Sequence, residues 1–189
     1  MQLNKIADVR SGLVITRKQA PKPEEAVCTY QLLNLKAVTD SGIDRSALLS
    51  FHATEQLADR YLTHAGDIIV RISEPYTAVC ITEDTAGLLV PSHFVIVRTE
   101  PEKAQPEYVA WYLNRDRIRK AFRLSCAGVL LQIKPSTVAE TEIRLPDLDK
   151  QQQIVKLNRL AQEELALLEK QLDLKRLKYK KLIETVNRM

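Results

Sequence analysis

The last forty residues of the chain, 150–189, contain neither proline nor glycine, and this uninterrupted stretch constrains the fold more than any other feature. Within it, residues at alternating spacings of four and three form a largely apolar heptad seam, which is the pattern of a coiled coil. The seam consists of Ile154, Asn158, Ala161, Leu165, Leu168, Leu172, Lys175, Tyr179, Leu182, Val186 and Met189. At about 1.5 Å per residue the helix would be roughly 55 to 60 Å long, too long for a domain of this size to cover. We therefore expect it to pair with another helix, or to pack only partly on its own domain.

The start of this helix is marked by Pro146, and Asp149 followed by Gln152 predicts an N-cap with its reciprocal partner. We place the boundary here, between a globular domain, 1–146, and a long helix, 147–189. A second apolar stripe lies off the seam and consists of Leu157, Leu160, Leu167, Leu174 and Leu177. This stripe can pack on the globular domain or on another subunit. A single amphipathic helix folded back on its own domain is the alternative.

Composition restricts the class of protein. With 189 residues, 45% of them hydrophobic and 28% charged, the chain can bury one sizeable core and is not expected to be disordered. No apolar run approaches the roughly 18 residues of a membrane helix, and the N-terminus lacks the pattern of a signal peptide. We therefore expect a cytoplasmic protein that does not bind membranes. The three cysteines, Cys28, Cys80 and Cys126, are widely spaced and indicate reduced core thiols.

The excess positive charge is confined to the end of the chain. Residues 1–150 hold 19 basic and 19 acidic side chains, whereas residues 151–189 hold 9 basic and 5 acidic ones, which accounts for the net charge of +4. A neutral domain can still bind nucleic acid if its basic residues cluster on one face.

Short β-rich apolar runs dominate the first hundred residues and predict sheet. They occupy 13–16, 30–35, 67–72, 77–81 and 94–98, separated by turn signals at Gly42, Gly66 and Gly87. The segment 17–25 contains two prolines and is expected to form a protruding loop that is basic at its start.

A change of pattern follows Pro106. Apolar residues at helical spacing predict a helix to Phe122, with an outer face of Arg115, Arg117, Arg119, Lys120 and Arg123. A short strand at 129–133, a turn of helix from Ser136 and a strand at 143–145 complete the domain. The predicted fold class is α+β: a mixed β-sheet domain with short helices, followed by one long C-terminal coiled-coil helix.

The residues do not suggest a catalyst. The five glycines are isolated, so no phosphate-binding or S-adenosylmethionine motif can be assembled from local sequence. The three histidines have no ligand spacing with Cys, Asp or Glu, and nothing is similar to a GxSxG or catalytic-cysteine signature. We expect no catalytic residue, metal or cofactor, and therefore a binding protein.

The order of short motifs is distinctive. VRSG stands at 9–12, AGDIIVRIS at 65–73, PSHFVIVR at 91–98 and PEYVAWYLN at 106–114; CAGVLLQIKPSTVAETEIRLP follows at 126–146 and QQQIVKL at 151–157. This succession resembles one half of the specificity subunit of type I restriction-modification systems, a single target-recognition domain with one spacer helix. Members of this family usually carry a proline-rich junction that ends in Glu-Gln before the helix. Here only Pro146 is present, and Lys150 precedes Gln151.

The resemblance implies a non-catalytic subunit that recognises double-stranded DNA for a DNA adenine methyltransferase. In the family, two recognition domains stand at opposite ends of an antiparallel helix pair and read a bipartite target. Methyltransferase subunits dock around the pair, and a motor-nuclease subunit can join. A chain with one domain and one helix is then either a half-length subunit that dimerises or a fragment. Dimerisation would use Ile154, Ala161, Leu165, Leu168, Leu172, Tyr179, Leu182 and Val186.

Candidate DNA contacts come from basic and polar clusters, because phosphates require positive charge and base edges require planar donors. The loop 17–25 offers Arg17, Lys18 and Lys22, and the segment after the run 67–72 offers Arg71, Ser73 and Tyr76. The helix face offers Arg119 and Arg123, whereas the Lys-rich tail at 175–181 is more typical of a solvated helix end. The alternative function is a homodimeric coiled-coil scaffold or regulator with only non-specific DNA binding.

Overall fold

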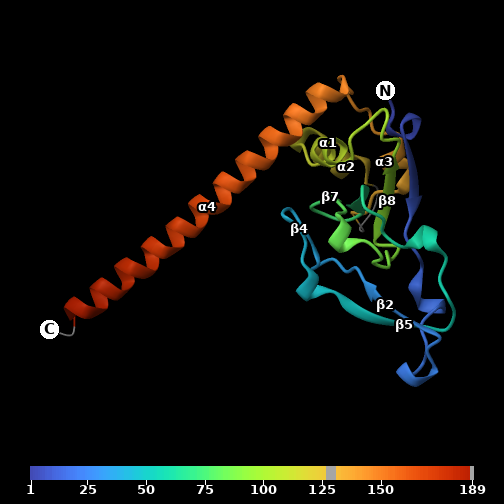
Figure 1. The fold of residues 1–189 in the computed structure, drawn as a ribbon, viewed down its shortest axis with the longest axis horizontal. Coiled ribbons are helices and arrows are strands. Elements are labelled where there is room, and N and C mark those ends of the chain that lie inside the picture. The colour runs from blue at the N-terminus through green and yellow to red at the C-terminus, as the bar shows by residue number, and fades with distance from the viewer. Residues whose placement is uncertain (127–130, 188–189) are drawn as a thin grey trace. The chain divides into compact units, whose positions relative to one another are not determined.

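A four-stranded antiparallel sheet with the order β1-β8-β6-β7 organises the first part of the chain (Figure 1). Its strands are β1 (Ala7–Ser11), β8 (Phe94–Thr99), β6 (Asp67–Arg71) and β7 (Ala78–Cys80). This computed structural model describes residues 1–126 and 131–187. The chain divides into two compact units, Met1–Gln151 and Gln152–Met189.

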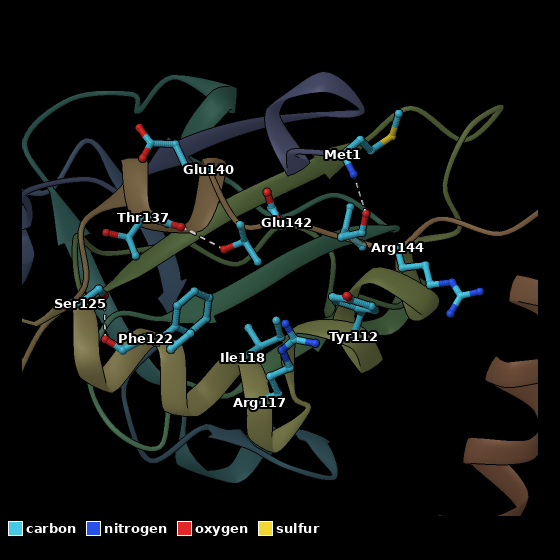
Figure 2. A pocket seen from close by; sticks show the side chains of 13 residues that line it. Met1, Tyr112, Arg117, Ile118, Phe122, Ser125, Thr137, Glu140, Glu142 and Arg144 are labelled. Atoms are coloured by element: carbon cyan, nitrogen blue, oxygen red, sulfur yellow. Dashed lines mark hydrogen bonds between the residues drawn. The ribbon is translucent and has the colours of Figure 1, made fainter.

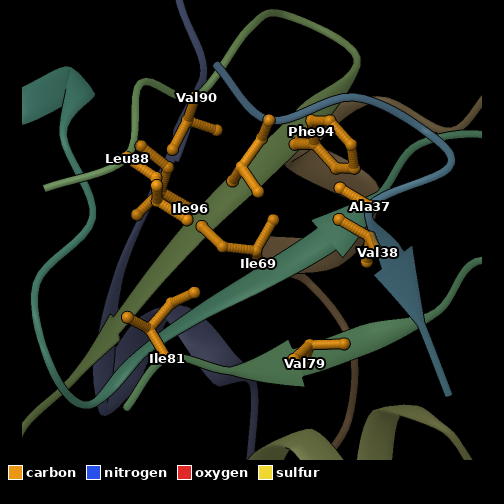
Figure 3. Close-up of a cluster of buried hydrophobic side chains, with 10 residues drawn as sticks. Ala37, Val38, Ile69, Val79, Ile81, Leu88, Val90, Phe94 and Ile96 are labelled. Atoms are coloured by element: carbon orange, nitrogen blue, oxygen red, sulfur yellow. The ribbon is translucent and has the colours of Figure 1, made fainter. Parts of the chain in front are cut away.

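The core lies on both faces of this sheet, which explains why its central strands are continuous apolar runs. Ile69, Phe94 and Ile96 point to one face, where Ala37 and Val38 pack against them (Figure 3). Because side chains alternate along a strand, the remaining buried apolar residues of β6 and β8 point to the opposite face. Helices α1 (Pro106–Leu113) and α3 (Pro135–Ala139) contact the sheet through β6, β7 and β1.

Two smaller ribbons complete the β structure. Strand β2 (Cys28–Leu32) pairs with β5 (Leu49–Ala53), and their side chains bury a second cluster around Phe51 and Leu89. A short hairpin joins β3 (Val38–Thr39) to β4 (Gly42–Ile43). Its turn needs Gly42, whose φ of 126° is unfavourable for residues with a side chain. Short 3-10 helices connect the strands: Leu3–Lys5, Ile15–Arg17, Pro23–Glu25, Arg45–Ala47, Asp59–Tyr61 and Glu83–Thr85.

The predicted helix after Pro106 is two helices, α1 (Pro106–Leu113) and α2 (Asp116–Ser125). The chain leaves α1 because the Asn114 side chain bonds the backbone of strand β7: its Nδ2 donates to the Ala78 carbonyl at 2.7 Å, and its Oδ1 accepts from the Ala78 amide at 2.9 Å. Arg115 is extended between the two helices. The one-helix prediction is therefore wrong at this point.

The other strand predictions have mixed outcomes. The runs at 67–72, 77–81 and 94–98 become β6, β7 and β8. The run 13–16 is not a strand, because it enters a 3-10 helix at Ile15. Residues 143–145 form no strand either; Ile143 donates a single backbone bond to Met1. Of the strand predicted at 129–133, residues 129 and 130 lie outside the described residues, and Gln132 forms an isolated bridge with Ser73. Helix α3 (Pro135–Ala139) contains the turn predicted at Ser136.

The long helix is present as α4 (Leu148–Asn187). Its N-cap is Asp147 rather than Asp149, because the Asp147 carboxylate accepts from the Lys150 amide at 2.8 Å. The α+β fold class with a long C-terminal helix is confirmed. Within the residues that the structure covers, no helix is long and apolar enough to cross a membrane. The three cysteines are free, as predicted, but they are half-buried and not fully buried in the core.

Candidate nucleic-acid interface

Arg71 stands at the end of β6, half-buried, and links two loops. Its two terminal nitrogens donate to the carbonyls of Leu35 at 3.3 Å and Glu74 at 3.2 Å. Burial lowers the pKa of Arg71, and the negative charge of Asp40 opposes this shift. Because a guanidinium has five N–H groups, each terminal nitrogen keeps one further donor for a ligand.

Arg119 on α2 belongs to a network at the tip of the β3–β4 hairpin. Its Nη2 donates to the Asp40 carboxylate at 2.6 Å and to Asn114 Oδ1 at 2.8 Å. Thr77 also donates to Asp40, at 3.2 Å. The exposed Asp40 carboxylate therefore connects the hairpin to helix α2 and to the residue before β7, and Arg119 extends the network to Asn114 at the end of α1.

Arg123 lies one helical turn after Arg119 and forms an ion pair with Glu74. Both side chains are well exposed, so solvent screens the pair and its contribution to stability is small. Arg71 bonds the carbonyl of the same Glu74. The three arginines therefore form one cluster around Asp40 and Glu74, which we call the arginine cluster.

Tyr76 was predicted as a DNA contact, but its side chain does not reach the surface. Its side chain is 1% exposed and packs edge-on against Phe122, with ring centroids 6.0 Å apart. Its hydroxyl donates to the Leu131 carbonyl at 3.3 Å, and burial raises the pKa of Tyr76 to about 12. Ser73 is half-buried, and its carbonyl accepts from the Tyr76 amide. Tyr76 is therefore a core residue, not one presented to a DNA groove.

The loop 17–25 begins at the end of the 3-10 helix Ile15–Arg17, contains the 3-10 helix Pro23–Glu25 and lies along β5. Lys18 bonds Glu55 at 2.5 Å, and its carbonyl accepts from the Thr54 amide at 3.0 Å. Arg17 and Lys22 are exposed. In Figure 1 the β2–β5 ribbon lies at the opposite end of the first unit from α1 and α2. The structure thus does not bring this loop together with the arginine cluster.

A hollow of about 750 Å³ lies between α2, α3 and the N-terminal residue (Figure 2). Arg117 and Arg144 contribute positive charge to its lining, and Glu140 and Glu142 contribute negative charge. A lining of both signs has no preference for phosphate. Sequence reasoning found Arg117 on the outer helix face but gave no role to Arg144 or to the acidic residues.

The predicted seam of α4 is exposed over most of its length. Leu165 is 60% exposed and Leu182 50%, and the leucines of the second stripe are equally open. Ile154, at the start of the seam, is half-buried. Met189 lies outside the described residues. An apolar stripe of this length that is open to water is typical of an interaction surface.

The fold is also found in known structures. No family model and no curated protein matches the sequence. The HsdS subunit from Thermoanaerobacter tengcongensis matches at 17% identity with a TM-score of 0.68, covering 89% of this chain and 43% of that one. A structure on complex assembly and conformational transition of the type I R-M system matches at 17% identity with a TM-score of 0.69, covering 90% and 43%. The type I S subunit from M. genitalium matches at 14% identity with a TM-score of 0.52, covering 93% and 42%.

The chain therefore has the fold of proteins that combine a domain of antiparallel sheets and short helices with one long helix. More specifically, this is the fold of type I restriction-modification specificity subunits, as the order of the sequence motifs predicts. The chain spans less than half of the length of the matched chains.

Proposed function

We propose that this chain is the DNA-recognition subunit of a type I restriction-modification complex, acting in the cytoplasm on double-stranded DNA. The observation that carries the proposal is the continuous α4, which starts directly from a domain with the specificity-subunit fold. The subunit is not itself an enzyme: it selects the target, and a separate methyltransferase subunit transfers the methyl group to adenine.

The subunit is half-length and dimerises through the seam of α4. Residues Ala161, Leu165, Leu168, Leu172, Tyr179, Leu182 and Val186 are exposed, and pairing would remove this apolar surface from water. Ile154 begins the same seam. A two-fold dimer prefers an interrupted palindrome, because the symmetry of the protein is mirrored in the DNA.

The second stripe of α4 is the docking surface for the methyltransferase subunit. Its five leucines are between 49% and 70% exposed and lie off the seam, so a helix pair formed through the seam leaves them available. A motor-nuclease subunit joins through the methyltransferase.

DNA contacts come from the arginine cluster and from the loop 17–25. Arg71, with Ser73 beside it, is held rigidly enough to read a base edge, whereas Arg119 and Arg123 neutralise phosphates after exchanging their carboxylate partners. Arg17, Lys18 and Lys22 supply a second basic site beside β5.

The test is co-expression with the cognate methyltransferase subunit, followed by mapping of methylated adenines. We expect methylation at one interrupted palindrome. Random methylation, or none, would overturn the proposal. DNA binding that weakens with salt but is equal for all sequences would favour the alternative, a homodimeric scaffold or regulator. The pairing of all three arginines with protein groups is the observation that favours this alternative.

A further inference from the structure

The two halves of the exposed part of α4 carry opposite charge. Residues 163–173 contain four acidic side chains and one basic, whereas residues 174–184 contain five basic side chains and one acidic. Both segments are exposed throughout. The ion pairs within α4 are Arg159 with Glu163 at 3.7 Å and Arg176 with Asp173 at 3.4 Å, as far as the described residues show. Most of this charge therefore remains free to meet a partner.

This distribution selects the orientation of a second copy. In a parallel pair each residue faces its own number, so the acidic segment would face an acidic segment, and Lys175 of the seam would meet Lys175. In an antiparallel pair the acidic segment faces the basic one. Opposite charges at flanking positions select partner and orientation in helix pairs, so a second copy is favoured in the antiparallel arrangement.

Charge also selects the register, that is, which residues of the two helices face each other. Because the seam repeats every seven residues, the alternative registers differ by shifts of seven residues of one helix along the other. We propose, building on the dimer of the proposed function, that residues whose numbers add to 347 face each other across the seam. Leu165 then meets Leu182, and Leu168 meets Tyr179. The flanking Glu169 lies beside Arg176 of the second copy, twice in each dimer.

The neighbouring registers are worse on charge. If the numbers of facing residues add to 340, Glu169 lies beside Glu169 of the second copy. If they add to 354, Arg176 lies beside Arg176 of the second copy. Each places like charges at a flanking position, which is unfavourable. The sum of 347 also faces the whole segment 163–173 with the segment 174–184, its charge complement.

The chosen register gives Lys175 and Asn158 distinct places. Lys175 faces Leu172 next to the two-fold axis, where its long aliphatic stem can cover the leucine while its ammonium group reaches water. Asn158 lies at the end of the paired region, far from this axis. The polar interruption at Lys175 therefore lies at the centre of the pair, and a shift of seven residues would place it opposite Leu165 or Tyr179 instead.

Spin-label distances test this register directly. Lys156, Lys170 and Leu177 occupy the same heptad position, so labels attached there differ only in their place along the axis. With the centre between residues 173 and 174, labels at 170 and at 177 give equal distances, and a label at 156 gives a distance about 30 Å longer. The measurement uses single-cysteine variants (K156C, K170C or L177C) of the full chain in which Cys28, Cys80 and Cys126 are replaced by serine. The same sites are also labelled through a non-natural amino acid in the chain that keeps its cysteines.

The outcomes separate the register from the dimer. Equal distances at 170 and 177, with the long distance at 156, support the proposal. A difference of about 10 Å between 170 and 177 indicates a shifted register, and equal distances at all three sites indicate a parallel pair. Either result in a dimer of the correct mass overturns the register and leaves DNA recognition by a dimer standing. A monomeric mass without spin coupling overturns both.

Discussion

Arg119 on α2 donates a hydrogen bond of 2.6 Å to Asp40 in the turn of the β3–β4 hairpin, 79 residues away along the chain. The arginine is only 25% exposed, whereas the aspartate is 68% exposed. A DNA phosphate approaching Arg119 would therefore meet the carboxylate first. In the DNA contact that we propose for Arg119, Asp40 occupies the position that a phosphate would take, and it holds the guanidinium in place before DNA binds.

Asp40→Asn is expected to strengthen binding to DNA of any sequence by roughly twofold to fivefold, since an exposed ion pair contributes about 0.2 to 1 kcal/mol. The salt dependence should steepen by about one phosphate contact. Fluorescence anisotropy at several salt concentrations measures both effects. Glu102→Gln is the matched control, because it removes one exposed negative charge outside the arginine cluster. An equal gain in both variants would show that only net charge matters.

Arg71→Ala is expected to reduce discrimination at one base position by roughly 1 to 3 kcal/mol. It should also lower the free energy of unfolding by about 1 to 2 kcal/mol, because two loop carbonyls lose their donor. Arg71→Lys keeps the charge and tests whether the two-pronged geometry is needed. Competition binding with single-base variants of the target measures the discrimination. Lys178→Ala should instead leave the discrimination between sequences unchanged, with an equal loss of affinity for all sequences or no loss, and the same pattern for Arg71→Ala would refute its role in base reading.

The parts of the fold that were predictable are those with a local signal. Strands β6 and β8 are continuous apolar runs because both faces of the sheet are covered. Strand β1 at the sheet edge, Ala-Asp-Val-Arg-Ser, has no such run, and only its pairing with β8 makes it a strand. The end of α1 depends on the bonds of Asn114 to β7, 36 residues away, which no local pattern reveals.

The site was predictable in its residue types and not in its geometry. Arginines at 71, 119 and 123 stood out as basic residues, and they do form one cluster. Tyr76 was also predicted as a DNA contact, because it follows the same apolar run as Arg71. Its burial depends on Phe122 and Leu131, which approach from distant segments. No local pattern indicated Asp40 as the partner of these arginines, since its own partners lie far away along the chain.

Gln151 illustrates the same limit at the start of α4. It is one of three consecutive glutamines, yet it alone is fully buried. Its Oε1 accepts from the Gln105 amide at 2.9 Å, and its Nε2 donates to the carbonyls of Pro146 at 2.9 Å and Lys103 at 3.2 Å. The side chain thus fixes the first turn of the helix to the loop before α1.

Gln151→Ala is expected to lower the free energy of unfolding by about 1 to 3 kcal/mol, because it removes a fully buried side chain and leaves three partly buried backbone groups without a partner. Gln152→Ala and Gln153→Ala are ideal controls, since both side chains are exposed and should change stability by less than about 0.5 kcal/mol. Urea unfolding followed by circular dichroism provides the comparison. Similar effects at all three positions would mean that the anchor is not specific to Gln151.

Placing charge on the two faces of α4 should separate its two proposed partners. Leu165→Glu combined with Leu168→Glu puts carboxylates into the seam opposite Leu182 and Tyr179, where burial of an unpaired charge is strongly unfavourable, so the dimer should dissociate. Leu167→Glu combined with Leu174→Glu adds the same charge to the second stripe and should leave the dimer intact while the methyltransferase subunit no longer co-purifies. Light scattering gives the mass, and co-purification shows whether the methyltransferase subunit is bound.

A seam variant that keeps the dimeric mass would contradict pairing through the seam. A stripe variant that still binds the methyltransferase subunit would place that docking surface elsewhere. Both variants keep the helical length and the same added charge, so a difference between them is due to the face that is changed.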